Sequence, residues 1–168
     1  TDERRGAVKY SEPLLLVTDY DIETVEQLLP ILEVVARENR PLVIVSENIE
    51  GQALAAVIMN AIRGTMKIAA VKAPRYGEER RNILKDLALS VGGAFVSRDS
   101  GLQLQDAKLV HLGTAKTIDI LKNVTTIVGG KGDFEDVEKR IESLKTELEQ
   151  TDSLYECERI QERITRLA

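Results

Sequence analysis

The sequence predicts an α/β fold, in which a layered sheet is flanked by helices and followed by a β-hairpin and a C-terminal helical hairpin. Three observations support this fold class. Short apolar runs alternate with segments of helical periodicity over the first hundred residues, which is typical of βαβ units and a parallel sheet. Two alternating segments between residues 116 and 128 predict the β-hairpin. From residue 134 onward the chain is rich in charge, with apolar residues at helical spacing.

Each predicted strand of the parallel sheet is a short continuous apolar run, which indicates burial on both faces. The β-hairpin that follows has strands joined by a turn at 122–124, because an asparagine stands between two alternating segments. The predicted strands are Leu14–Thr18, Leu42–Val45, Lys67–Val71, Ala94–Val96, Lys116–Leu121 and Thr125–Val128.

Three helices are predicted between the strands of the sheet, and each has a recognisable breaker residue. We expect Pro30 in the first turn of the first helix, where its missing N–H costs nothing. Gly64 is expected to cap the end of the second helix, and Gly92 and Gly93 to end the third. The predicted ranges are Val25–Glu38, Gly51–Arg63 and Glu78–Val91.

Residues 134–168 are predicted to form a charged helical hairpin with a narrow apolar stripe on each helix. The break lies at residues 151–153, where Ser153 and Glu156 have the spacing of a capping box that starts the second helix. The stripes consist of Val137, Ile141, Leu144 and Leu148 on the first helix, and Cys157, Ile160, Ile164 and Leu167 on the second.

Composition limits the function classes. The 168 residues correspond to one domain, and the net charge of −5 with 4% aromatic residues argues against nucleic-acid binding. No apolar run approaches the roughly 18 residues of a membrane helix. A single cysteine and a single histidine cannot supply a structural zinc site. Because the chain begins with Thr1 and not with Met, we expect it to be a piece of a longer protein.

Few residues are candidates for catalysis. Cys157 lies on an apolar helix stripe and His111 lies between apolar neighbours, so both are interpreted as structural residues, not as a nucleophile and its base. The glycine-rich loop Gly129–Gly132 could cradle a phosphate through its backbone N–H groups. It matches neither the Walker pattern nor the dinucleotide fingerprint, so a plain turn is the favoured interpretation.

The first two helices are apolar almost all round. Between Ala53 and Ile62 only Asn60 is polar, and Glu33 alone interrupts the apolar run around Pro30. One face of each helix must cover the sheet, and the other faces are either buried under a further layer or exposed as an apolar patch. No third layer is evident, so the sequence favours an exposed groove between two helices that binds apolar segments of other chains.

The same stretches carry a family resemblance that spans essentially the whole chain. The run Val71–Pro74, followed by Gly77 and Arg80-Arg81, is its most specific part. The chain resembles the apical domain of the group I chaperonins, the GroEL family. The other matching stretches are Leu29–Ala36, Glu50–Ala55, Asn60–Gly64, Ala69–Pro74, Val91–Gly93 and Gln161–Arg163.

The resemblance implies a molecular chaperone domain, 1–168, that binds non-native polypeptides and the mobile loop of a co-chaperonin. It implies no catalytic residue and no cofactor in this chain, because the family's ATP and magnesium site belongs to other domains. The parent protein is expected to form a heptameric ring in the bacterial cytoplasm, or in mitochondria or plastids, and the excised domain to be a monomer. The binding residues carried over are Leu29, Leu32, Glu33, Leu54, Ile58, Met59 and Asn60.

The chain also departs from the family pattern. Ile58 and Met59 stand where the family usually has valine, and Arg75-Tyr76 stand where it commonly has Gly and Phe. The family's aromatic contacts would lie before Thr1, and its hinge glycines just after Ala168. Two alternatives stay open: a phosphate- or nucleotide-binding module that uses Gly129–Gly132, and a specialised paralogue with its own clients.

Overall fold

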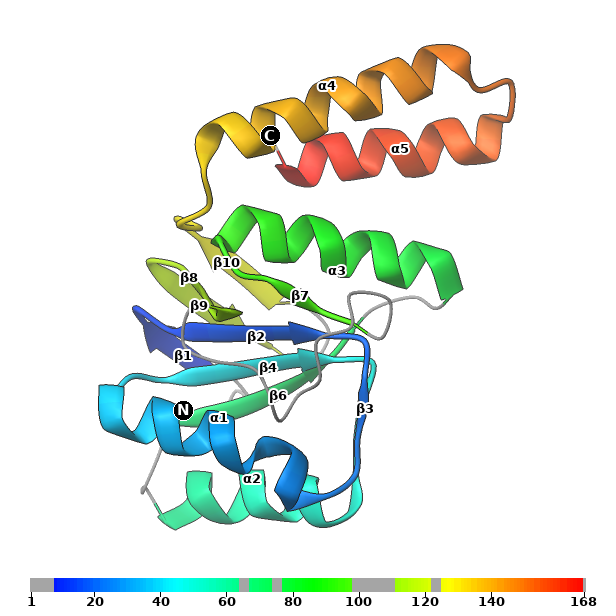
Figure 1. Cartoon of the computed structure of the whole chain (residues 1–168). Helices are drawn as coiled ribbons and strands as arrows, with labels where there is room; N and C mark the ends of the chain where they lie inside the picture. The colour runs from blue at the N-terminus through cyan, green and yellow to red at the C-terminus, as the bar shows by residue number, and fades with distance from the viewer. Residues whose placement is uncertain (1–7, 64–66, 74–76, 98–110, 122–124, 168) are drawn as a thin grey trace.

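The computed structural model describes residues 8–63, 67–73, 77–97, 111–121 and 125–167. It is a mixed α/β structure with parallel strands, as the sequence predicts (Figure 1). The described strands are β1 (Val8–Ser11), β2 (Leu14–Thr18), β3 (Asp21–Ile22), β4 (Leu42–Ser46), β5 (Asn48–Ile49), β6 (Ile68–Lys72), β7 (Phe95–Val96), β8 (Gly113–Thr114), β9 (Thr117–Ile120) and β10 (Thr125–Val128). The described helices are α1 (Val25–Glu38), α2 (Gly51–Arg63), α3 (Gly77–Val91), α4 (Phe134–Gln150) and α5 (Leu154–Leu167).

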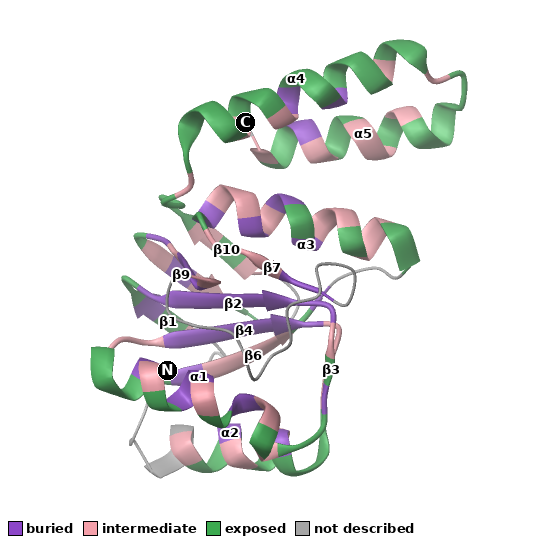
Figure 2. Ribbon diagram, in the orientation of Figure 1, coloured by how far each residue is buried: buried purple, intermediate pink, exposed green. Residues whose placement is uncertain are grey.

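The central sheet has the strand order β6-β4-β2-β7, with every neighbouring pair parallel, and β8 pairs antiparallel with β2. Leu16 lies opposite Ile44, which lies opposite Ala70. Every residue of β2 and β4 is buried, which explains why both strands are continuous apolar runs in the sequence (Figure 2). The parallel sheet predicted from the sequence is confirmed.

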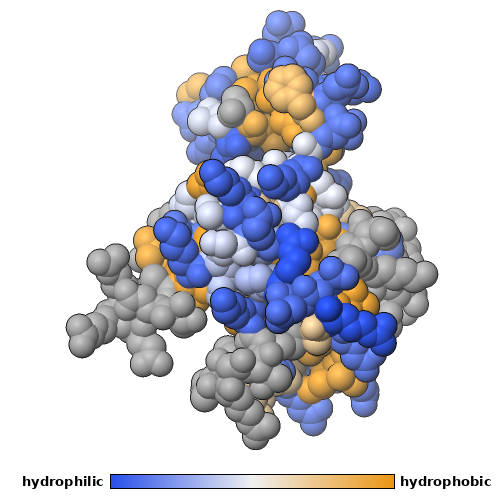
Figure 3. Space-filling view, turned by 90° about the vertical axis from the view of Figure 1, so that its left-hand side faces the viewer, coloured by the Kyte–Doolittle hydropathy of each residue, from blue (hydrophilic) through white to orange (hydrophobic). Residues whose placement is uncertain are grey.

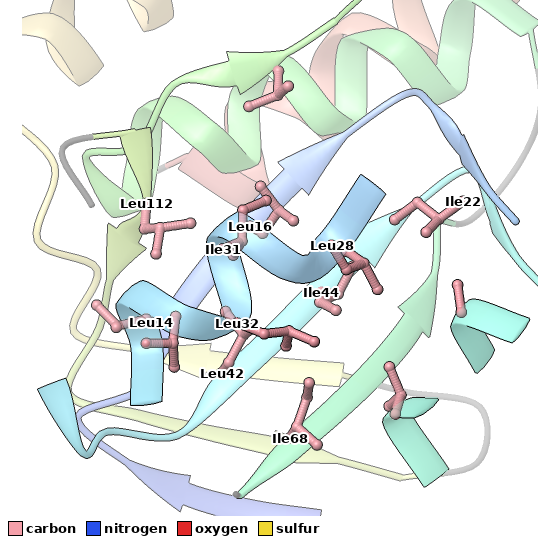
Figure 4. Close-up of a cluster of buried hydrophobic side chains, with 14 residues drawn as sticks. Leu14, Leu16, Ile22, Leu28, Ile31, Leu32, Leu42, Ile44, Ile68 and Leu112 are labelled. Carbon is pink, nitrogen blue, oxygen red and sulfur yellow. The ribbon is translucent and has the colours of Figure 1, made fainter. Parts of the chain in front are cut away.

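One face of the central sheet is covered by α1 and α2. Leu28, Ile31 and Leu32 of α1 point onto the strand residues Leu16 and Ile44 (Figure 4). Ala53 and Val57 of α2 belong to the same buried cluster, which Ile68 of β6 also joins. The helix ranges predicted from the sequence agree with the structure, because each helix has an apolar face that this sheet buries.

The opposite face is covered by α3 and by a small antiparallel sheet with the order β1-β9-β10. The predicted hairpin of β9 and β10 is confirmed, although its turn lies outside the described residues. Its third strand, β1, is not predicted from the sequence, because its partner β9 lies over a hundred residues away. The second core fills the space between the layers, with Leu84 and Ala88 of α3 against Val43 and Val45 of β4.

The ends of α1 follow local sequence signals, with one correction. Gln27 Oε1 accepts hydrogen bonds from the backbone N–H groups of Glu23 and Thr24, at 3.0 and 3.1 Å, and these contacts fix the start of the helix. Asn39 ends it in the left-handed conformation, with φ 53°. Pro30 lies inside the helix and not in its first turn, so the prediction for this residue is wrong. Gly64, the expected cap of α2, lies outside the described residues.

The predicted helical hairpin is formed by α4 and α5, which have an apolar cluster of their own. Ile141, Leu144 and Ile164 are buried between the two helices. Among the described residues, this cluster contains none from outside α4 and α5. Ser153 Oγ accepts a hydrogen bond from the Glu156 N–H at 3.4 Å, which is half of the predicted capping box. The Glu156 carboxylate accepts a hydrogen bond from Thr151 Oγ1 instead, at 2.9 Å.

Charged side chains, not shared apolar residues, join the hairpin to α3. Asp86 of α3 is 6% exposed and accepts hydrogen bonds from Arg140 of α4 at 2.8 Å and from Arg163 of α5 at 2.7 and 3.0 Å. The contact with Arg163 uses both carboxylate oxygens, the geometry that gives arginine pairs their strength. Arg159 of α5 forms a further ion pair with Glu79 of α3. We call the group Asp86, Arg140 and Arg163 the Asp86 clamp.

Candidate functional site

The outward faces of α1 and α2 expose large aliphatic side chains. Leu29 of α1 is 44% exposed, and Ile58 and Met59 of α2 are each 47% exposed. Leu54 is half-buried and precedes Ile58 by four residues, so the two lie on one face of α2. We call Leu29, Leu54, Ile58 and Met59 the α1–α2 patch. Figure 3 shows hydrophobic surface at the lower end of the molecule, where these two helices lie.

Other predicted binding residues are placed differently. Leu32 is only 7% exposed and belongs to the core under α1, so it offers little surface to a ligand. Glu33 is exposed one turn after Leu29, which places a carboxylate beside the patch. Asn60 is half-buried, and its Nδ2 donates a hydrogen bond to the Ala56 carbonyl at 2.9 Å, which leaves its amide oxygen for a partner.

A short strand pair holds the starts of α1 and α2 together. β3 leads into α1, β5 leads into α2, and the two pair in parallel with Asp21 opposite Asn48. The Ala53 N–H donates a hydrogen bond to the Glu23 carbonyl at 3.2 Å, which ties the first turn of α2 to the start of α1. Gly51 sits at this junction with φ +62°, where a Cβ atom would approach the Glu23 carbonyl oxygen at 3.2 Å.

This junction explains why the two helices lie side by side on the sheet (Figure 1). Because both helices leave a parallel strand pair in register, they run in the same direction from a common edge. Sequence reasoning missed β3 and β5, and a two-residue strand carries no periodicity that could reveal it. The one local signal in the sequence is Gly51, but helical spacing makes it the first residue of the predicted helix.

The side chains of the patch are suited to apolar contact and not to catalysis. Its four side chains are aliphatic or thioether groups, which contain no acid, base or nucleophile. Aliphatic surface attracts other aliphatic surface without directional requirements, and methionine adapts its shape to different partners. The patch can therefore bind apolar side chains of another polypeptide, with Glu33 as the neighbouring charge.

The glycine-rich loop packs against the end of α3. A Cβ atom on Gly130 would collide with the Ser90 carbonyl oxygen, and one on Gly132 with the Leu89 carbonyl oxygen. The N–H groups of Lys131 and Gly132 already donate hydrogen bonds to Thr114 and Ser90, at 2.9 and 3.1 Å. Carbonyl groups at a helix C-terminus repel anions. Close packing thus explains these glycines, and the geometry disfavours a phosphate cradle here.

We therefore predict that Gly132→Ala destabilises the domain by about 1–3 kcal/mol, the usual cost of forcing atoms into a packed site. Gly132 has no positive φ, so the loss would come from the collision with α3 and not from backbone strain. Urea unfolding measures the difference. Gly77→Ala is the comparison for backbone strain without steric contact, because no atom of a non-neighbouring described residue lies within 4 Å of its Cβ position, whereas its φ of +65° is strained. A fully stable Gly132→Ala variant would contradict the packing explanation.

The remaining candidates for chemistry lie on separate elements. Cys157 is half-buried on α5, with its Sγ 3.9 Å from the Thr151 carbonyl oxygen, and His111 lies just before β8. In the described part of the chain, no cluster of three or more histidine, cysteine and acidic residues has the spacing to hold a metal ion.

No family model matches the chain. Among the described helices, none is both long enough and apolar enough to cross a membrane.

Proposed function

We propose that this chain is a chaperone domain that binds exposed apolar segments of non-native polypeptides, and the mobile loop of a co-chaperonin, on the α1–α2 patch. The observation that carries the proposal is the exposure of Leu29, Ile58 and Met59 on two adjacent helices. Single exposed apolar residues are common on folded proteins, whereas exposed apolar residues gathered on adjacent elements more often mark an interaction surface. The proposed parent is a group I chaperonin, and the α/β fold with paired helices over a parallel sheet is compatible with its apical domain.

The energetics of the patch predict weak binding by a single domain. Burying a leucine or isoleucine side chain is worth roughly 1.5–3 kcal/mol. Two or three such contacts, worth about 3–9 kcal/mol together, offset only the lower part of an association cost of about 4–15 kcal/mol, so an isolated domain should bind peptides at micromolar levels or weaker. The low sequence specificity that a chaperone needs follows from the same physics, because apolar contact has no directional requirement.

A ring of such domains would bind one client at several patches. Every contact after the first is intramolecular, so the apparent affinity rises without any new chemistry. In the proposed parent, ATP and magnesium act in other domains and drive release, and the compartment is the bacterial cytoplasm or an organelle. Within this chain the proposal assigns no catalytic residue, because the residues of the patch are aliphatic.

Isothermal calorimetry separates this proposal from the alternative, a phosphate- or nucleotide-binding module. We predict that ATP with magnesium, and inorganic phosphate, give no binding heat, whereas an amphipathic helical peptide with leucines on one face binds at micromolar concentration. The peptide binding should also show a negative heat-capacity change, the signature of buried apolar surface. The sign of the heat-capacity change distinguishes apolar contact from contact through charge alone. Saturable nucleotide binding without peptide binding would favour the alternative.

A further inference from the structure

The outer edge of β10 lacks the charged residue that the other longer edge strands carry. β10 is the terminal strand of the β1-β9-β10 sheet, and its sequence is Thr-Thr-Ile-Val. The other edge strand of that sheet, β1, contains the exposed Lys9, and the edge strand β6 of the central sheet contains the exposed Lys72. Charged residues on edge strands prevent pairing with other chains. Of the described edge strands of four or more residues, β10 alone contains no charge.

A large cleft of mixed, mainly apolar lining lies beside this strand. Its volume is about 1280 Å³, and Thr125 and Ile127 of β10 line it together with Ile83 and Leu87 of α3 and with Phe134 and Val137 of α4. Phe134 is 75% exposed, and Val128, the last residue of β10, is 49% exposed. Four charged side chains, Lys72, Asp86, Glu138 and Arg166, line it too, and Asp86 of α3 is already paired in the Asp86 clamp.

We propose that the edge of β10 is a second polypeptide-binding site, which takes an extended, uncharged apolar segment as an added antiparallel or parallel strand. The segment pairs its main chain with β10 and directs alternate side chains into the cleft beside Ile127. An added strand lies about 4.8 Å beyond its neighbour and presents every second side chain to one face, so a regular strand reaches both features at once.

The occupant is an extended segment because an edge offers main-chain groups. In an antiparallel sheet alternate residues of the edge strand direct their N–H and C=O groups away from the sheet. Only an extended chain can satisfy a row of such groups, since a helix has its own donors and acceptors paired internally. The absence of charge on β10 selects segments of β-branched and other uncharged residues, because a buried charge would find no partner on this strand.

The source of that segment, a non-native protein, rests on the proposed chaperone function, whereas the edge site itself does not. The α1–α2 patch and β10 lie on opposite faces of the central sheet, α1 and α2 on one and the β1-β9-β10 sheet on the other (Figure 1). The first site contacts side chains only, and the second contacts the main chain. A domain with both binds apolar segments in two conformations.

The test uses fluorescence anisotropy with a fluorescein-labelled peptide of alternating valine and threonine, flanked by lysines. Its partner probe is the same peptide N-methylated at three consecutive central residues, which removes donors on both edges and keeps the side chains. The chain variants are Val128→Lys, which adds a charge to the edge, and Val128→Thr as the uncharged control. Ile58→Glu serves as the variant that disables the α1–α2 patch.

We expect the unmethylated peptide to bind the unsubstituted domain, the Val128→Thr variant and the Ile58→Glu variant with equal affinity. N-methylation should weaken binding by a factor of ten or more, as expected for the loss of two or three main-chain hydrogen bonds. Val128→Lys should weaken binding by a similar factor with an unchanged circular dichroism spectrum.

Equal affinity for the methylated peptide would overturn the proposal and leave the chaperone proposal intact. Loss of binding in Ile58→Glu would also overturn it, because the peptide would then occupy the α1–α2 patch. Sedimentation of the peptide-free domain tests a second copy as occupant. A dimer that dissociates in the Val128→Lys variant would show that β10 pairs with β10 of a second copy, which contradicts the proposal.

Discussion

Ile58→Glu is expected to weaken the binding of an amphipathic apolar peptide by a factor of ten or more, while the circular dichroism spectrum and the unfolding midpoint stay unchanged. Ile58 is exposed, so the carboxylate remains in water in the free domain and costs little there. In the complex the same carboxylate would be buried against apolar side chains. The lost burial of one isoleucine is worth about 1.5–3 kcal/mol, which already corresponds to a factor of ten.

Two control variants define this expectation. Leu154→Glu changes an equally large exposed side chain on α5, away from α1 and α2, and should leave peptide binding unchanged. Val57→Glu changes the residue that precedes Ile58, which is buried in the core, and should unfold the domain. If Ile58→Glu unfolds the domain as Val57→Glu does, then Ile58 is a core residue and the α1–α2 patch is not a binding surface.

Asp86→Ala is expected to destabilise the attachment of the helical hairpin by about 3 kcal/mol, because removal of one partner leaves two charges unpaired in a half-buried setting. Arg163 is the more buried of the two arginines, with its side chain 15% exposed against 32% for Arg140. Hydrogen bonding to Asp86 raises the pKa of Arg163 above its ordinary value, although burial acts in the opposite direction. A raised pKa gives stability that is complete below the unfolded-state pKa, so the contribution of Arg163 persists throughout the neutral range.

Hydrogen exchange followed by mass spectrometry measures this effect by segment. In Asp86→Ala we expect protection of the backbone amides to fall in α4 and α5 and to persist in β2 and β4. The reason is that α4 and α5 share an apolar cluster that is separate from the cluster at the central sheet. The matched control is Glu142→Ala on α4, whose pair with Lys145 at 3.7 Å is exposed and should contribute less than about 1 kcal/mol. An equal loss of protection in β2 and β4 would contradict the separation of the two apolar clusters.

The sequence predicted the elements whose signals are local. The ranges of α1, α2 and β10 agree with the structure, because periodicity and turn residues act over a few positions. The strands β1, β3, β5 and β8 were missed, since they are short and their partners are distant in the chain. Pairing over such distances depends on the assembled sheet and leaves no pattern within one segment.

The candidate site could be predicted in part. An almost wholly apolar helix indicates either a further covering layer or an exposed apolar face, and it does not fix which residues lie on that face. The structure shows how α1 is rotated about its axis, with Leu32 in the core and Leu29 outside it. The burial and pairing of Asp86 were missed for another reason. An acidic residue in a helix is normally predicted to lie at the surface. The partners of Asp86 lie 54 and 77 residues later, and only the packed hairpin brings them together.

The most direct test of the central claim is a map of the surface that an apolar peptide contacts. Titration of the ¹⁵N-labelled domain with the amphipathic helical peptide reports on every backbone amide. The account predicts chemical-shift changes that saturate together and cluster on the outward faces of α1 and α2, around Leu29, Ile58 and Met59. Changes confined to α4 and α5, or no saturable change at millimolar peptide, would contradict the claim that the α1–α2 patch binds polypeptides.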